Sequence, residues 1–135
     1  NLEILNSIKE CHLVIDQLIV GWYGLFALEA MSHSKPVITF LRDDLVDFYT
    51  FNRIIDKDDI KNDYLYSSLK SRENLYPPII NSNVFNLENI IIDIYNGKIN
   101  LKYFSRNGYK YCKKYHSINS MSKRFKYISH KIGVV

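Results

Sequence analysis

The residues of this chain that could bind a ligand gather in one short glycine-bearing segment near the N-terminus. They include acidic, amide, glycine and aromatic residues and one leucine: Asp16, Gln17, Gly21, Trp22, Tyr23, Gly24 and Leu25. Gly24 stands immediately before an apolar helical pattern. The first backbone N–H groups of a helix carry partial positive charge and lack partners within the helix, so this position predicts a site for an anion such as a phosphate.

One β–α–β unit is expected to position these residues. The apolar run at 13–15 is typical of a buried strand that delivers Asp16 to its carboxyl end. A helix is predicted from about Leu25 to His33, and a second β-rich run covers Val37–Phe40. Open α/β sheets bind ligands at the carboxyl ends of such strands, and we therefore expect the ligand at this edge of a parallel sheet.

The segment GWYGLFALEAMSHSKPVI resembles the nucleotide-sugar-binding segment of GT-B glycosyltransferases, particularly the large family 4 of retaining enzymes. The family's Gly-Leu, small-Leu-Glu-Ala-Met and Pro-Val-Ile elements are matched by Gly24–Leu25, Ala27–Met31 and Pro36–Ile38. Ser34 stands where the family most often has glycine, and Gly21 occupies the place of the first glutamate in a two-glutamate motif whose second member is Glu29.

The resemblance implies that Glu29 accepts hydrogen bonds from the ribose hydroxyls of a nucleotide, which a carboxylate does strongly. It also implies that the first glutamate's contact with the transferred sugar is unfilled at Gly21, or has moved to Asp16 or Gln17. The residues around Glu29 on its helix are apolar, so we expect this helix to be buried on most sides and the carboxylate to need a partner. The alternative is a glutamate that merely faces solvent, since glutamate is a good helix former.

The fold that the resemblance implies is α/β: a Rossmann-like three-layer α/β/α domain with a parallel sheet, forming the C-terminal half of a GT-B enzyme. Residues 1–135 fit a single domain that carries amphipathic helices at its C-terminal end. The chain opens on Asn1 rather than Met, and we expect upstream residues to be absent.

The implied function is that of a glycosyltransferase whose donor half is this chain. A sugar would pass from a UDP- or GDP-sugar to a hydroxyl of an acceptor glycan or lipid-linked acceptor held by an N-terminal domain. Cell-surface polysaccharide, lipopolysaccharide or glycoconjugate synthesis would be the setting. Two alternatives stay open: a non-catalytic sugar-nucleotide-binding module, which Gly21 favours, and a GT-B-fold epimerase acting on a sugar nucleotide.

We expect no metal cofactor. The resembled enzymes generally need none, and the four histidines and two cysteines show no metal-ligand spacing. Solvated loop acids are the better interpretation of the pairs Asp43–Asp44 and Asp58–Asp59. The absence of an 18-residue apolar run, a secretory signal and a disulfide pattern predicts a cytoplasmic protein with reduced thiols.

The remaining elements were predicted from periodicity and cap residues. A helix is expected from Leu2 to Cys11, a long irregular or lid-like connection from Leu41 to Tyr76, and a short strand over Pro77–Asn81. Asn86 is a candidate N-cap for a helix that Gly97 closes. Two amphipathic helices follow, with Ser117 capping the second; their apolar stripes are Leu101, Phe104, Gly108, Tyr111 and Tyr115, then Ile118, Met121, Phe125, Ile128 and Ile132.

This C-terminal region is strongly basic. Residues 94–135 hold ten Lys or Arg and no Asp or Glu, whereas residues 1–93 hold eight basic and fourteen acidic residues. Three interpretations arise: a solvated face whose apolar side packs on the sheet, peripheral contact with an anionic membrane, or nucleic-acid binding. Tyr111 and Tyr115 lie on the apolar stripe and no nucleic-acid motif accompanies the charge, so no nucleic acid is expected as a partner.

Overall fold

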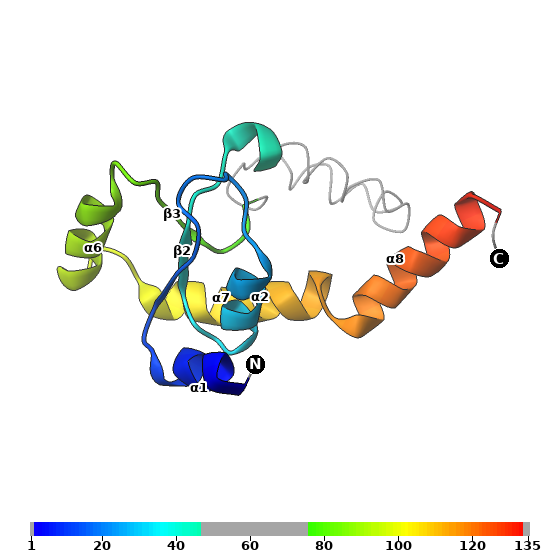
Figure 1. Cartoon of the computed structure of the whole chain (residues 1–135), viewed down its shortest axis with the longest axis horizontal. Coiled ribbons are helices and arrows are strands. Elements are labelled where there is room, and N and C mark those ends of the chain that lie inside the picture. Colours follow the sequence, from blue (N-terminus) through cyan, green and yellow to red (C-terminus); the bar gives the residue numbers. More distant parts are fainter. Residues whose placement is uncertain (1, 47–75, 134–135) are drawn as a thin grey trace.

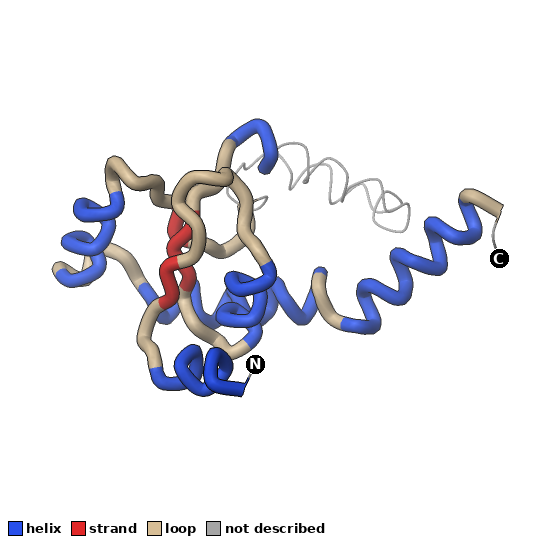
Figure 2. Tube along the Cα trace, viewed as in Figure 1, coloured by secondary structure: helices blue, strands red, loops and turns tan. Residues whose placement is uncertain are grey.

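The computed structural model describes residues 2–46 and 76–133. These residues fold as an α/β unit around a small parallel sheet (Figures 1 and 2). The sheet has three strands in the order β1 (Val14–Ile15), β2 (Val37–Thr39) and β3 (Ile80–Asn81), and both neighbouring pairs are parallel. The β–α–β unit and the later strand are thus confirmed, although each strand is shorter than the apolar run that predicted it.

The structure has five labelled helices: α1 (Leu2–Glu10), α2 (Leu25–Ser32), α6 (Leu87–Tyr95), α7 (Leu101–Tyr115) and α8 (Ile118–Lys131). Ser117 caps α8 as predicted, because its hydroxyl accepts a hydrogen bond from the Ser120 amide at 3.3 Å. Asn86 occupies the N-cap position of α6 but makes no side-chain cap bond. Its Oδ1 instead accepts from the Ser82 hydroxyl and the Asn83 amide, so it stabilises the turn before the helix.

The main core lies between one face of the sheet and the helices α2 and α7. The strands contribute Val14 and Val37 to this core, and the two helices contribute Ala27, Ala30, Met31, Tyr111 and Cys112. A Cβ added to Gly108 of α7 would lie 3.1 Å from Met31 Cγ, so this glycine lets the two helices approach closely. Burial raises the pKa of the Cys112 thiol to about 11. Cys11 and Cys112 are both free, and Cys112 is suited to packing rather than to thiolate chemistry.

The other face of the sheet carries a row of isoleucines. Ile15, Ile38 and Ile80 are adjacent in the strand register, and side chains alternate between faces along a strand. Ile38 and Ile80 are buried, but Ile15 on the edge strand is 45% exposed. The prediction of a buried first strand is therefore correct for Val14 and wrong for Ile15, because only the central part of this face is covered.

Helix α2 is buried on one side only, which corrects the expectation that it would be enclosed. Ala27, Ala30 and Met31 are fully buried, whereas Leu25 is 80% exposed and Glu29 is exposed as well. The composition of the helix is almost wholly apolar, but only one face meets the sheet and α7. The other face of α2 is therefore apolar but exposed, and no second element packs against it among the described residues.

The long connection between β2 and β3 falls mostly outside the described residues. Residues 43–46 are helical and follow β2 closely. The lid-like segment predicted between Leu41 and Tyr76, and the acid pair Asp58–Asp59 within it, lie largely or wholly in 47–75, which the structure does not describe.

Candidate functional site

The carboxyl ends of the three parallel strands meet at one edge of the sheet, and the loop from Asp16 to Gly24 lies there. Backbone hydrogen bonds tie this loop to the end of β2: the Asp16 amide donates to the Ile38 carbonyl at 2.9 Å, and the Phe40 amide donates to the Gln17 carbonyl at 3.0 Å. The Thr39 hydroxyl also donates to the Gln17 carbonyl, at 2.6 Å. The sheet therefore holds the first half of the loop firmly.

The side chains of Asp16 and Gln17 brace the loop from inside. Asp16 Oδ2 accepts a hydrogen bond from the Gly24 amide at 3.3 Å, and Gln17 Nε2 donates to the Trp22 carbonyl. These bonds join the two ends of the loop and fix the direction in which α2 starts. They also place a negative charge beside the start of α2, and a bound anion would have to lie away from that carboxylate.

The start of α2 offers backbone donors to solvent. Gly24 is the N-cap, and in the described part of the chain nothing accepts a hydrogen bond from the amides of Leu25 and Phe26. Glu29 lies one helical turn after Leu25 and therefore on the same exposed face. Its carboxylate makes no hydrogen bond or ion pair within residues 2–46 and 76–133. Donors for an anion and an acceptor for hydroxyl groups thus stand on one accessible surface.

Gly21 has a backbone that a side chain would strain. Its φ is +90°, and a Cβ built on it would lie 2.6 Å from Cγ of Arg42. The Arg42 amide also donates to the Gly21 carbonyl at 2.9 Å, which fixes the two residues together. A glutamate at this position would strain the backbone and displace the Arg42 side chain, so this loop conformation disfavours it. The departure from the two-glutamate motif is therefore part of the geometry of the loop.

Arg42 is a residue that sequence reasoning missed. Its guanidinium forms a two-point ion pair with Asp44, with an Nη2–Oδ2 distance of 2.6 Å, at the surface beside the loop. The hydrogen bond and charge of Asp44 raise the pKa of Arg42, and the hydrogen bond from Arg42 lowers the pKa of Asp44. Arg42 brings a cation to the loop at 16–24, because its stem packs against Gly21. No spacing in the sequence signals this, because the proximity arises from the turn after β2.

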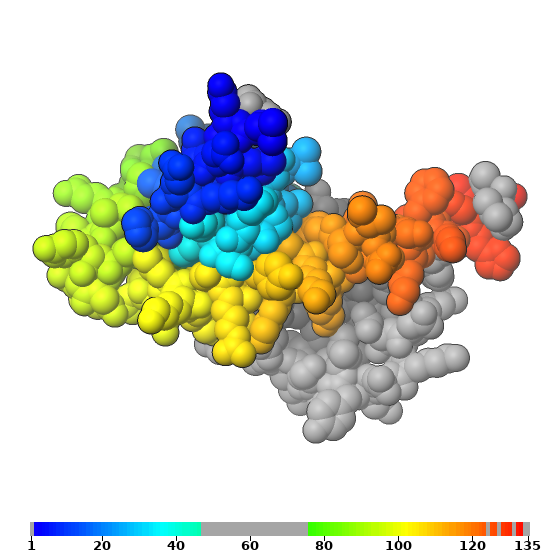
Figure 3. All heavy atoms as spheres, turned by 90° about the horizontal axis from the view of Figure 1, so that it is seen from below, coloured from blue at the N-terminus to red at the C-terminus, as the bar shows by residue number. Residues whose placement is uncertain are grey.

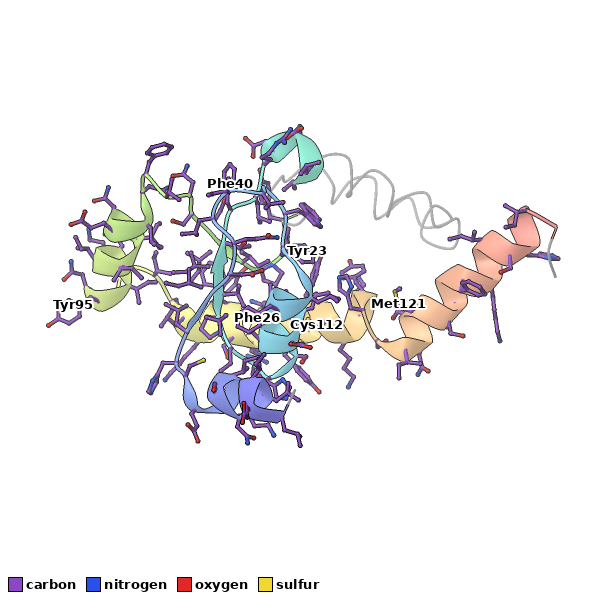
Figure 4. The ribbon with its side chains drawn as sticks, viewed as in Figure 1. Tyr23, Phe26, Phe40, Tyr95, Cys112 and Met121 are labelled. Atoms are coloured by element: carbon purple, nitrogen blue, oxygen red, sulfur yellow. The ribbon has the colours of Figure 1, made fainter. Side chains whose placement is uncertain are left out.

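Tyr23 anchors the loop to the C-terminal half of the chain. Its hydroxyl lies 2.7 Å from the Tyr111 hydroxyl and 3.3 Å from His116 Nε2, and the Tyr23 side chain is buried (Figure 4). Trp22 stacks on Tyr23 with ring centroids 4.7 Å apart. Tyr23 thus points into the molecule, toward α7, and Trp22 is the half-buried ring of the pair. The sequence predicted a structural role for Tyr111, but it did not predict the specific pairing of Tyr111 with Tyr23.

Neither a metal-binding cluster nor a membrane-spanning helix is found in the part of the chain that the structure describes. There, no three His, Cys, Asp or Glu side chains are grouped so that they could hold a metal ion. Asp43 accepts a hydrogen bond from the Tyr76 hydroxyl, and Asp44 pairs with Arg42. Among the described helices, none combines the length and the apolar character needed to cross a bilayer.

Comparison of the chain with family models, with curated proteins and with solved structures finds no match. The candidate site therefore rests on the geometry of the loop and of α2, together with the motif resemblance.

Proposed function

We propose that the surface formed by the loop at 16–24 and the start of α2 binds a sugar nucleotide, and that the chain is the donor-binding half of a GT-B glycosyltransferase. One observation carries the proposal: among the described residues, the amides of Leu25 and Phe26 and the carboxylate of Glu29 have no hydrogen-bond partner, and α2, which exposes Glu29, starts at the carboxyl edge of the parallel sheet. Helix-start amides suit a diphosphate, and a carboxylate one turn away suits vicinal ribose hydroxyls.

The proposal includes the finer fold, a Rossmann-like three-layer domain. In its support, α2 and α6 lie on opposite sides of the strands in Figure 1. The isoleucine row on the face away from α2 is apolar, as a second helix layer requires. The proposed reaction passes a sugar from UDP- or GDP-sugar to an acceptor hydroxyl, in a cytoplasmic pathway of glycan synthesis, and requires an acceptor-binding domain outside this chain.

Calorimetric titration with UDP and with GDP tests the site directly. One nucleotide should bind the wild-type chain, and Glu29→Ala should lose about 1.5–3 kcal/mol, roughly ten- to 150-fold in Kd, as expected for a hydrogen bond to a charged group. Glu88→Ala is the matched control, because Glu88 is also an exposed glutamate in a helix but lies on α6. Equal affinities for wild type and Glu29→Ala would remove Glu29 from the site. Failure of both nucleotides to bind would overturn the proposed function.

Gly21 favours a second candidate, a sugar-nucleotide-binding module without catalysis. The conformation at this position disfavours the acid that the resembled enzymes place near the transferred sugar. Incubating the full-length protein with UDP-glucose or GDP-mannose and an acceptor mixture distinguishes the two functions. Release of UDP or GDP coupled to glycoside formation indicates the transferase, and tight binding without release indicates the module.

A further inference from the structure

Helix α8 carries a continuous apolar stripe that is exposed over its whole length. The five residues at helical spacing are Ile118 (87% exposed), Met121 (52%), Phe125 (73%), Ile128 (54%) and Ile132 (65%), the last being the C-cap. An amphipathic helix that packed on the sheet would bury this stripe. The expectation that the apolar side of the C-terminal region packs inward is therefore wrong for α8, although it holds for Tyr111 on α7.

The reason is the position of α8. The helix continues past the end of α7 after a turn at His116–Ser117 and projects from the body of the molecule (Figures 1 and 3). Of the α8 side chains that the structure describes, only Ser129 is buried. The core cluster contains no residue of this helix. The stripe is thus presented to the surroundings rather than to the sheet.

The charged residues of α7 and α8 are all basic. No acidic residue follows Asp93, while ten basic residues do. Lys123 and Lys126 are exposed on the side of α8 away from the stripe, and Lys113 and Lys114 are exposed at the end of α7 where α8 begins. An apolar face, a lysine-bearing face and no carboxylates together define a helix suited to the interface of an anionic bilayer.

We propose that α8 binds an anionic lipid surface, with the apolar stripe entering the acyl boundary and the lysines meeting the headgroups. The basic charge of this region favours an anionic lipid surface over a second copy of the chain as the partner of α8. A second copy of the chain would bring two strongly basic regions together, whereas an anionic bilayer complements them. The inference is independent of the proposed nucleotide site, which lies on the loop at 16–24 and α2.

Co-sedimentation of the full-length protein with lipid vesicles tests the proposal. The vesicles are phosphatidylcholine alone and phosphatidylcholine mixed with phosphatidylglycerol, each at low and high salt. We expect binding to the anionic vesicles only, with weakening as salt rises, because added ions screen the lysines. The double variant Lys123→Gln/Lys126→Gln should bind more weakly at low salt, since it lowers the charge without changing the stripe.

A second pair of variants separates insertion from simple charge attraction. Phe125→Ser/Ile128→Ser should weaken anionic-vesicle binding at least tenfold. Its matched control is Val84→Ser/Phe85→Ser, which also removes two exposed apolar side chains, 52% and 92% exposed, but outside α8. Unchanged binding of the α8 double variant, or no vesicle binding by wild type, would overturn the proposal. So would a wild-type dimer by sedimentation velocity that the α8 double variant abolishes, because the stripe would then be a self-association face.

Discussion

At Gly21 both the loop conformation and a neighbouring side chain disfavour a residue that has a Cβ atom. The φ of +90° disfavours any Cβ, and the stem of Arg42 occupies the space that a Cβ would take. The cation that this packing places at the strand edge is paired with Asp44. The resemblance to the two-glutamate motif would place an acid here, whereas the structure has a glycine packed against the stem of Arg42.

Substituting Gly21 separates these two effects. Gly21→Ala should lower the free energy of unfolding by at least about 1–2 kcal/mol, the cost of a left-handed backbone for a residue with a Cβ, with the clash against Arg42 in addition. In the double variant Gly21→Ala/Arg42→Ala the clash is relieved but the backbone strain remains. Urea unfolding of the four proteins measures the coupling. Strict additivity would show that crowding by Arg42 contributes nothing.

Residue identity alone predicted part of this site. The glycines and Glu29 are recognisable because their spacing matches a known motif, and the missing first glutamate is visible in the same way. The sequence does not reveal three other features of the loop: the brace formed by Asp16 and Gln17, the φ of Gly21 and the approach of Arg42. Each depends on how the turn after β2 returns to the loop, and that geometry has no periodic signature in the sequence.

At the scale of elements, the Tyr23–Tyr111 pair couples the loop at 16–24 to α7. Tyr111→Phe removes one hydroxyl from a buried pair and should cost about 0.5–1.5 kcal/mol of unfolding free energy. Amide hydrogen exchange should accelerate in the loop at 18–24 and stay unchanged in β2, whose bonds do not involve Tyr111. Tyr109→Phe is the control on the same helix, because Tyr109 is exposed. Equal exchange in both variants would contradict the coupling.

Helices and strands were the most predictable part of the fold. Periodicity, Ser117 and Gly97 located α6, α7 and α8 within a residue or two, and the basic residues of α7 face outward as expected. What periodicity could not predict is the surface that each apolar face meets. The stripe of α7 reaches the core through Tyr111, while the equally regular stripe of α8 is exposed.

At the scale of the molecule, the acidic and basic residues divide along the chain. Residues 1–93 carry a net charge of −6 and residues 94–135 a net charge of +10, from which the overall +4 follows. Helix α7 lies in the basic part, where it packs on the core through Tyr111 and Cys112 and exposes its lysines. Helix α8 shares the charge but supplies no residue to the core cluster.

The folded core should therefore tolerate removal of most of α8. A chain ending at Ser120 keeps the bond from the Ser120 hydroxyl to the Lys114 carbonyl, at 2.6 Å, and keeps His116 beside Tyr23. We expect its free energy of urea unfolding to differ from that of the full chain by less than about 1 kcal/mol, as for changes away from packed features. A noncooperative transition would show instead that α8 is part of the folding unit.

Trp22 is the only tryptophan of the protein, and it lies in the loop at 16–24, stacked on Tyr23. Light that excites indole alone will therefore report from one known place in the molecule. A ligand bound at the start of α2 would change the polarity and quenching around that ring. The chain thus contains its own optical probe, placed where occupancy of the loop can be followed without any label.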